Sequence, residues 1–215
     1  QAIVDKVQQY PENPGQLTLA DLAAYQPQRR QPLCSSYAPK RVEPPRTYLI
    51  CGFPPPGSGA IAIAQILGII NHTEAAFLPF ATPLWMHYYS EAARLAFADR
   101  AQYVADPDFV AAPVGNWYAL IQPEYLAERA RLIGPHSMQV ARAGSPSPGP
   151  MTQAAMPEQP EYGTSHLSIA DQYGNVLAMT TTIEDAFGAR QMVRGFLLNN
   201  QLSDFSFVPR DDNGE

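Results

Sequence analysis

Two threonines, Thr164 and Thr182, lie at the far ends of two segments that together predict a β-hairpin. Residues 164–169 and 176–183 are rich in β-branched and apolar side chains, and the polar segment 171–175 contains the glycine that a three-residue hairpin loop requires. If the two ends of that loop pair, Thr164 lies opposite Thr182 on one face of the hairpin. One hydroxyl can then orient the other for nucleophilic attack. The same register pairs Ala170 with Val176, Ser168 with Ala178, and His166 with Thr180.

Threonine pairs also have a purely structural explanation, because they stabilise many sheets without taking part in chemistry. The position of Thr164 favours the chemical interpretation. It directly follows Gly163, where a segment poor in bulky side chains gives way to a strand, so the peptide bond between the two residues is sterically open. From the residues alone, a structural threonine pair and a nucleophilic threonine beside an exposed peptide bond both remain open.

Helix signals precede this hairpin. Thr18 and Asp21 form a capping box at the start of a short helix. The proline-rich run 54–59 leads into residues that are apolar on every side, which predicts a fully buried helix capped by Ser58.

Thr82, followed by a proline, begins the clearest helix, which ends before the Asp-Pro pair at 106–107. Its apolar stripe is predicted to be core and comprises Trp85, Tyr89, Ala92, Ala96 and Tyr103. A further helical stretch over 124–133 carries charges that we interpret as solvated, namely Glu128, Arg129 and Arg131.

Strand-like residues occupy 32–53 and contain both cysteines of the chain, Cys34 and Cys51. If these segments pair as neighbouring strands, the two thiols lie close together, and a disulfide and two buried thiols remain equally open alternatives. The segment 143–160 is rich in Gly, Ser, Pro, Gln and Met, which predicts an exposed, mobile linker.

Composition excludes several classes of protein. The chain has 215 residues, of which 46% are hydrophobic and 16% charged, as in a globular protein with a real core. The 22 prolines argue against an all-helical bundle. A net charge of −6 and the lack of a basic run oppose nucleic-acid binding. The longest apolar run, 59–70, is too short for a membrane span, and the histidines show no metal-ligand spacing.

Several short motifs occur along the chain in a definite order. Those before the hairpin are LTLADLAAY at 17–25, PPPGSG at 54–59, ADR at 98–100 and DPDF at 106–109. Those from the hairpin onward are TSHLSIAD at 164–171, GN at 174–175, FG at 187–188 and GFLLNNQLSDFS at 195–206. In this order they resemble the γ-glutamyltransferase (γ-glutamyl transpeptidase) family, around the junction of its large and small subunits.

The resemblance implies an α+β fold of the N-terminal nucleophile hydrolase type, an αββα sandwich that this chain contains only in part, truncated at both ends. It implies a precursor that cuts itself between Gly163 and Thr164. Residues 1–142 then belong to the large-subunit region, 143–163 to the linker, and 164–215 to the start of the small subunit. The freed Thr164 would supply both the attacking Oγ and, through its α-amine, the base.

The resemblance also assigns the other site residues. Thr182 matches the threonine that hydrogen-bonds the nucleophile, while Gln201 and Asp204 match positions that hold the α-amino group of the γ-glutamyl substrate. Glu184 stands where the family more usually has asparagine, so it is a third substrate-binding candidate that either strengthens ammonium binding or repels the substrate carboxylate. Arg190 and Arg194 could pair with Glu184 or be solvated loop charges, and Asn200 and Ser203 stay unassigned.

By the same resemblance, the substrate-carboxylate arginine, a serine pair and a glycine-rich oxyanion loop belong to other parts of the polypeptide, so we expect this chain alone to lack activity. The expected protein is an exported, periplasmic or secreted enzyme of glutathione metabolism, made as a zymogen, without metal or other cofactor. Its partners are a small γ-glutamyl donor, a water, amino-acid or peptide acceptor, and the rest of its own polypeptide. The alternatives are a related acylase of the cephalosporin or polyglutamyl-transferring type, and a module that never cleaves itself.

Overall fold

The computed structural model describes residues 1–146, 155–156 and 163–204. The described residues form two compact units, one of 29–146 with 155–156 and one of 1–28 with 163–204. Both mix helices with strands, as expected for an α+β protein. No helix within the described ranges is long and apolar enough to cross a membrane.

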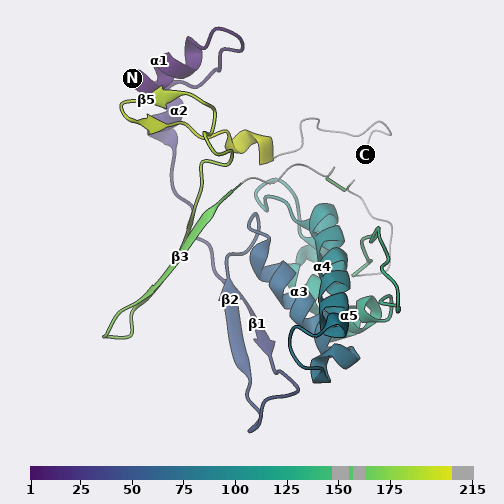
Figure 1. The fold of residues 1–215 in the computed structure, drawn as a ribbon. Coiled ribbons are helices and arrows are strands. Elements are labelled where there is room, and N and C mark those ends of the chain that lie inside the picture. Colours follow the sequence, from purple (N-terminus) through teal and green to yellow (C-terminus); the bar gives the residue numbers. More distant parts are fainter. Residues whose placement is uncertain (147–154, 157–162, 205–215) are drawn as a thin grey trace. The chain divides into compact units, whose positions relative to one another are not determined.

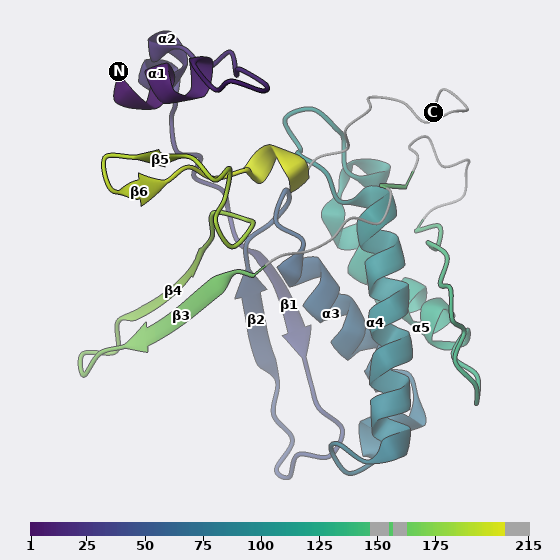
Figure 2. The same cartoon turned by 45° about the horizontal axis from the view of Figure 1, so that its top comes forward.

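The first of these units is built around helix α3 (Gly59–Asn71), which contacts a hairpin on one side and further helices on another (Figures 1 and 2). The hairpin strands are β1 (Leu33–Tyr37) and β2 (Tyr48–Gly52), as the strand-like composition predicted. The other elements, in chain order, are η1 (Glu74–Phe77), α4 (Pro83–Tyr103), η2 (Pro113–Gly115), η3 (Trp117–Ile121) and α5 (Pro123–Ala130).

Two apolar clusters form the core of this unit. One lies between α3, α4 and α5 and comprises Ile69, Ile70, Ala75, Ala92, Leu95, Leu126 and Ala130. The other joins the hairpin to the helices and comprises Leu33, Ile61, Tyr103, Leu120 and Tyr125. Burial of these side chains supplies most of the free energy that holds the elements together.

The helix starts agree with the sequence in part. Thr18 and Asp21 form the predicted capping box at helix α2 (Leu19–Ala24), and the Thr82 hydroxyl accepts from the Trp85 N–H at the start of α4. Ser58 precedes α3, but its side chain makes no capping bond and instead accepts from the Arg100 guanidinium at 3.0 Å. The prediction of a Ser58 cap was therefore wrong, because a long-range donor engages the hydroxyl.

Two burial predictions were also too simple. Helix α3 is not buried on every side, since Ile63 is exposed, and the apolar stripe of α4 is buried only toward its C-terminal part, at Ala92, Ala96 and Tyr103. Tyr89 at its other end is exposed. In α5, Glu128 and Arg131 are exposed as predicted, but the Arg129 prediction was wrong, because that side chain is buried.

Arg129 is buried because it neutralises a buried carboxylate. Its guanidinium lies 3.0 Å from Asp99 Oδ1, and both side chains are almost fully inaccessible. The other Asp99 oxygen accepts from Tyr125 Oη and Gln65 Nε2, each at 2.8 Å. Burial raises the pKa of the Asp99 carboxyl, and Arg129 and these donors oppose the increase.

This polar network also fastens the chain that leads out of the helices. The Gly144 N–H donates to Asp99 Oδ1 at 2.9 Å, and Arg129 donates to the Arg142 carbonyl at 2.8 Å. A side chain at Gly144 would come within 2.5 Å of Tyr125 Oη, so the backbone must approach closely here. Further on, the Met156 N–H donates to the Ala101 carbonyl at 2.9 Å. The remainder of the predicted linker, from 147, lies mostly outside the described residues.

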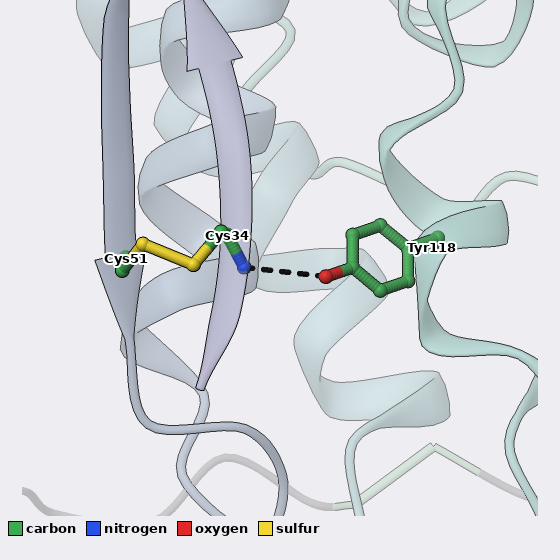
Figure 3. The surroundings of a disulfide bond; sticks show 3 residues. All are labelled: Cys34, Cys51 and Tyr118. Carbon is green, nitrogen blue, oxygen red and sulfur yellow. Dashed lines mark hydrogen bonds between the residues drawn. A yellow bond between two sulfur atoms is a disulfide. The ribbon is translucent and has the colours of Figure 1, made fainter. Parts of the chain in front are cut away.

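The cysteine pair resolves the alternatives that the sequence left open. Cys34 and Cys51 are register partners in the β1–β2 hairpin and form a disulfide (Figure 3). The Cys34 N–H also donates to the hydroxyl of Tyr118 in η3, at 3.3 Å. The bridge therefore closes the hairpin that packs against α3, and Tyr118 attaches η3 to the same hairpin.

The second unit contains the elements that carry the predicted site (Figure 1). Its elements are α1 (Ala2–Gln8), α2 (Leu19–Ala24), β3 (Ser165–Ala170), β4 (Val176–Thr181), β5 (Met192–Val193), β6 (Phe196–Leu197) and η4 (Gln201–Asp204). Strands β3 and β4 form one antiparallel pair and β5 and β6 another, and helix α1 contacts β5. Within the described residues of both units, every sheet has two strands.

Candidate active site at the end of the β3–β4 hairpin

The hairpin has the register that its turn predicts. The observed pairs include Ala170 with Val176, Ser168 with Ala178, and His166 with Thr180, which confirms those three predictions. The ladder ends with Ser165 opposite Thr181, so continuing it by one residue places Thr164 opposite Thr182.

The turn itself explains this register. Asp171 donates its N–H to the Asn175 carbonyl at 3.0 Å, and its carboxylate accepts from the Tyr173 and Asn175 N–H groups. Gly174 has φ +86°, the left-handed conformation expected at that position. The Asn175 side chain, followed by these backbone donors, lowers the pKa of Asp171. Local chemistry alone therefore fixes which residues of β3 and β4 face each other.

At the open end of the hairpin, the Thr182 hydroxyl lies beside the predicted cleavage bond. Its Oγ1 donates to the Gly163 carbonyl over a long 3.4 Å and accepts from the Glu184 N–H at 2.8 Å. The backbone N–H of Glu184 thus orients the Thr182 hydroxyl, and the hydroxyl proton points to the Gly163 carbonyl oxygen. This carbonyl belongs to the residue directly before Thr164.

The loop after Thr182 is attached to the start of η4. The Asn200 N–H donates to the Ile183 carbonyl at 3.3 Å, and Asn200 Oδ1 accepts from the Asp185 N–H at 3.0 Å. Asn200 Nδ2 also donates to the carboxylate of Glu184, which is 7% exposed. The structure therefore brings two segments that are distant in sequence to the same end of the hairpin.

Gln201 and Asp204 lie together on η4. Gln201 Nε2 donates to Asp204 Oδ2 at 3.0 Å, and the Gln201 N–H donates to Asn199 Oδ1 at 3.1 Å. Asp204 is exposed and Gln201 half-buried, so a carboxylate and an amide are presented side by side. Such a pair can accept hydrogen bonds from a ligand ammonium.

The arginines of this region differ in part from expectation. Arg190 lies 3.4 Å from Asp185 rather than pairing with Glu184, and Arg190 and Arg194 are both exposed, which agrees with the solvated alternative. Glu184 instead engages Asn200 and Ser203, two residues to which the sequence assigned no role. Their only sequence signal is the motif at 195–206, which does not show which side chain faces which loop.

Gly188 closes this loop against the segment before η4. It has φ +52°, and a Cβ there would lie 2.1 Å from the Leu198 carbonyl oxygen, a backbone atom that cannot move aside cheaply. We expect Gly188→Ala to lower the free energy of unfolding by about 2 kcal/mol or more, measured by urea denaturation of the full-length protein. Gly134→Ala is the control, since a Cβ at Gly134 meets nothing within 4 Å, and an equal effect of both changes would contradict the expectation.

Comparisons with known proteins agree on one family. The model of the family described as Gamma-glutamyltranspeptidase matches residues 1–215. The glutathione hydrolase proenzyme of Escherichia coli (strain K12) is 34% identical over 207 residues, covering 94% of this chain and 32% of that protein. The acylase ACY 1 proenzyme of Pseudomonas sp. (strain SE83) is 35% identical over 199 residues, covering 92% of this chain and 32% of that protein.

A solved structure supports the fold. Cephalosporin acylase from Bacillus halodurans matches with a TM-score of 0.71 at 24% identity, over 99% of this chain and 34% of that one. The mixed helix and strand content is that of an α+β chain. The chain belongs to the gamma-glutamyltranspeptidase family of enzymes, and it spans about a third of the length of the curated relatives that it matches.

Proposed function

We propose that these residues belong to a self-processing γ-glutamyl hydrolase and transferase, and that they contain both its cleavage bond and its nucleophile, Thr164. The observation that carries the proposal is the contact of the Thr182 hydroxyl with the Gly163 carbonyl, at the end of a hairpin whose register brings Thr182 opposite Thr164. A hydroxyl proton on that oxygen favours attack on the carbonyl carbon. Family membership and the proenzyme relatives are consistent with this chemistry.

Self-cleavage proceeds through an ester in this proposal. Thr164 Oγ adds to the Gly163 carbonyl carbon, the C–N bond of the peptide breaks, and the nitrogen takes the hydroxyl proton to become the free α-amine of Thr164. Water then hydrolyses the ester, which leaves a carboxylate on Gly163 and restores the Thr164 hydroxyl. The Thr182 hydroxyl stabilises the negative charge that develops on the Gly163 oxygen in the first step.

The freed threonine then performs acyl transfer with its own amine as the base. An α-amine has an ordinary pKa of about 7.7–8.0, so a useful fraction is neutral at pH 7–8 and can accept the Thr164 hydroxyl proton. The hydroxyl attacks the γ-carbonyl of the donor, the leaving amine departs with that proton, and an acyl ester forms on Thr164. Water or the amine of an amino acid or peptide then releases the acyl group.

Gln201 and Asp204 hold the α-ammonium group of the donor in this proposal. Their side chains lie 3.0 Å apart, and the exposed Asp204 carboxylate can make a charge-assisted bond to an ammonium. The remaining contacts of the donor, including the pairing of its carboxylate, come from other parts of the polypeptide, so we expect these residues alone to be inactive.

The hairpin also supports the sandwich fold that the family resemblance implies. Strands β3 and β4 expose an apolar face that carries Ile169, Leu177 and Met179, while the opposite face carries Val176 together with the polar His166 and Thr180. An exposed apolar sheet face is typical of a surface that another layer of the fold covers. We therefore infer that other parts of the same polypeptide complete this sheet.

The same proposal includes an exported location, which the disulfide supports. Disulfides persist in oxidising compartments such as the periplasm and outside the cell. The Cys34–Cys51 bridge is therefore consistent with a periplasmic or secreted enzyme.

A second candidate function is that of an acylase whose donor lacks an α-amino acid head group. The 35% identity to acylase ACY 1 supports it. To decide between the two, the full-length proenzyme is offered a γ-glutamyl anilide and the corresponding glutaryl anilide, which keeps the chain and its terminal carboxylate but lacks the ammonium. Faster release from the γ-glutamyl compound supports the first proposal, and faster release from the glutaryl compound supports the second.

Asp204→Asn tests the ammonium site directly. The change removes the charge but keeps the size of the side chain, so we expect KM for the γ-glutamyl anilide to rise about 10- to 100-fold while KM for the glutaryl anilide stays unchanged. Glu12→Gln, which neutralises an exposed carboxylate on the loop after α1, is the control. An equal rise for both donors would argue against an ammonium contact at Asp204.

A further inference from the structure

Glu184 is held in an unusual conformation by its neighbours. Its backbone has φ +75°, in the left-handed region that a non-glycine residue rarely adopts, and its side chain is 7% exposed. A buried, strained residue persists only where surrounding contacts determine it. Here its N–H donates to Thr182 Oγ1 at 2.8 Å, while its carboxylate accepts from groups on the other side of the loop.

Those groups belong to Asn200 and Ser203, which directly precede Gln201 and Asp204, the proposed ligand pair. Glu184 Oε2 accepts from Asn200 Nδ2 and lies 3.3 Å from Ser203 Oγ. Ser203 Oγ is in turn within 2.8 Å of the Asn200 carbonyl and 3.1 Å of Asn200 Nδ2. One oxygen of the Glu184 carboxylate therefore connects the loop that orients Thr182 to Asn200 and Ser203, which lie before and after Gln201 in the chain.

The accessibility of the carboxylates divides their roles. Asp204 is exposed and can meet a ligand, whereas Glu184 is buried and its Oε2 is engaged by neutral donors of the protein. An ammonium that bound Glu184 Oε2 would have to displace Asn200 Nδ2, and Asn200 also holds the Asp185 N–H and the Ile183 carbonyl. Direct binding would thus loosen the segment on which the Thr182 hydroxyl depends.

We propose that Glu184 is a positioning residue and does not itself bind the donor. Through Asn200 and Ser203, it couples the Thr182 hydroxyl to the Gln201–Asp204 turn. This role rests on the proposed function for its catalytic consequence, but the coupling of the two segments is a property of the fold. At this position, where the family usually has asparagine, Glu184 connects the loop that follows Thr182 to the turn that carries Gln201 and Asp204.

The test compares Glu184→Gln with Glu184→Ala in the full-length proenzyme. Glutamine keeps an oxygen that accepts from Asn200 and Ser203, so it should change KM for the γ-glutamyl anilide less than threefold. Alanine removes the acceptor, so kcat/KM should fall at least about tenfold, and rescue by glutamine is the expected signature of positioning. A rise in KM with Glu184→Gln as large as that with Asp204→Asn would overturn the proposal in favour of direct ammonium binding.

A second measurement does not depend on activity. Amide hydrogen exchange, followed by mass spectrometry, should speed up about tenfold in peptides covering 183–187 and 199–204 with Glu184→Ala but not with Glu184→Gln. Unchanged exchange with Glu184→Ala would refute the coupling even if the enzyme proved inactive on both anilides. Faster exchange in a protein that neither cuts itself nor hydrolyses a donor would uphold the coupling and refute the proposed function instead.

Discussion

Replacing Thr164 by alanine should leave the full-length proenzyme as a single uncut chain with only background activity. The change removes the one oxygen that both attacks the Gly163 carbonyl and receives the acyl group. We therefore expect kcat to fall more than 10³-fold, since removing a catalytic residue of this kind lowers kcat by about 10⁴–10⁶-fold. Intact mass spectrometry of fresh and incubated protein measures the cut, and anilide release measures the turnover.

Two further variants make this experiment specific. Thr164→Ser keeps a hydroxyl and should still cut, whereas Ser165→Ala, one residue along on β3, should cut like the unchanged protein. Fragments dividing between Gly163 and Thr164 in the alanine variant would show that another group performs the cleavage. An uncut unchanged protein would support the non-processing alternative.

Replacing Arg129 by alanine should cause the largest loss of stability. The change leaves the fully buried Asp99 carboxylate without its counter-charge and removes the hydrogen bonds that Arg129 donates to the Leu95 and Arg142 carbonyls. Breaking a buried ion pair in this way costs about 3–5 kcal/mol. Urea denaturation of the full-length protein measures it, with Arg131→Ala on the exposed side of the same chain segment as a control expected within about 0.5 kcal/mol.

The Arg129→Ala defect should also depend on pH. Burial raises the pKa of Asp99, and without Arg129 the folded-state pKa rises further above the unfolded value. A raised folded pKa means that the folded protein binds the extra proton, so stability is retained at low pH and lost as pH rises through the folded pKa. The deficit relative to the unchanged protein should therefore be smaller at pH 5 than at pH 8, and a deficit independent of pH would contradict this account.

The sequence predicted those parts of the molecule that local chemistry determines. The β3–β4 register follows from a single turn, in which Asp171 and Asn175 bond each other, and the α2 capping box follows from two residues three positions apart. Family resemblance added Gln201 and Asp204, which the structure places in contact. In each case the interacting groups are close in sequence, so their pattern is visible there.

Contacts between distant segments were not visible in this way. Arg129 reads as a solvated helix charge until Asp99, 30 residues earlier, is seen to be buried beside it. Glu184 meets Asn200 and Ser203 across a loop whose path depends on the conformation of Gly188. A buried polar partner is chosen by tertiary packing, and no spacing rule identifies it from the sequence.

The fastening of Gly144 and Met156 to α4 has a consequence for the products of the proposed cut. Asp99 holds the Gly144 N–H and the Ala101 carbonyl holds that of Met156, and Gly163 is only the seventh residue after Met156. A severed tail of that length reaches at most about 25 Å from its anchor. The new carboxylate would thus stay tethered within that distance of its anchor on α4 after the cut.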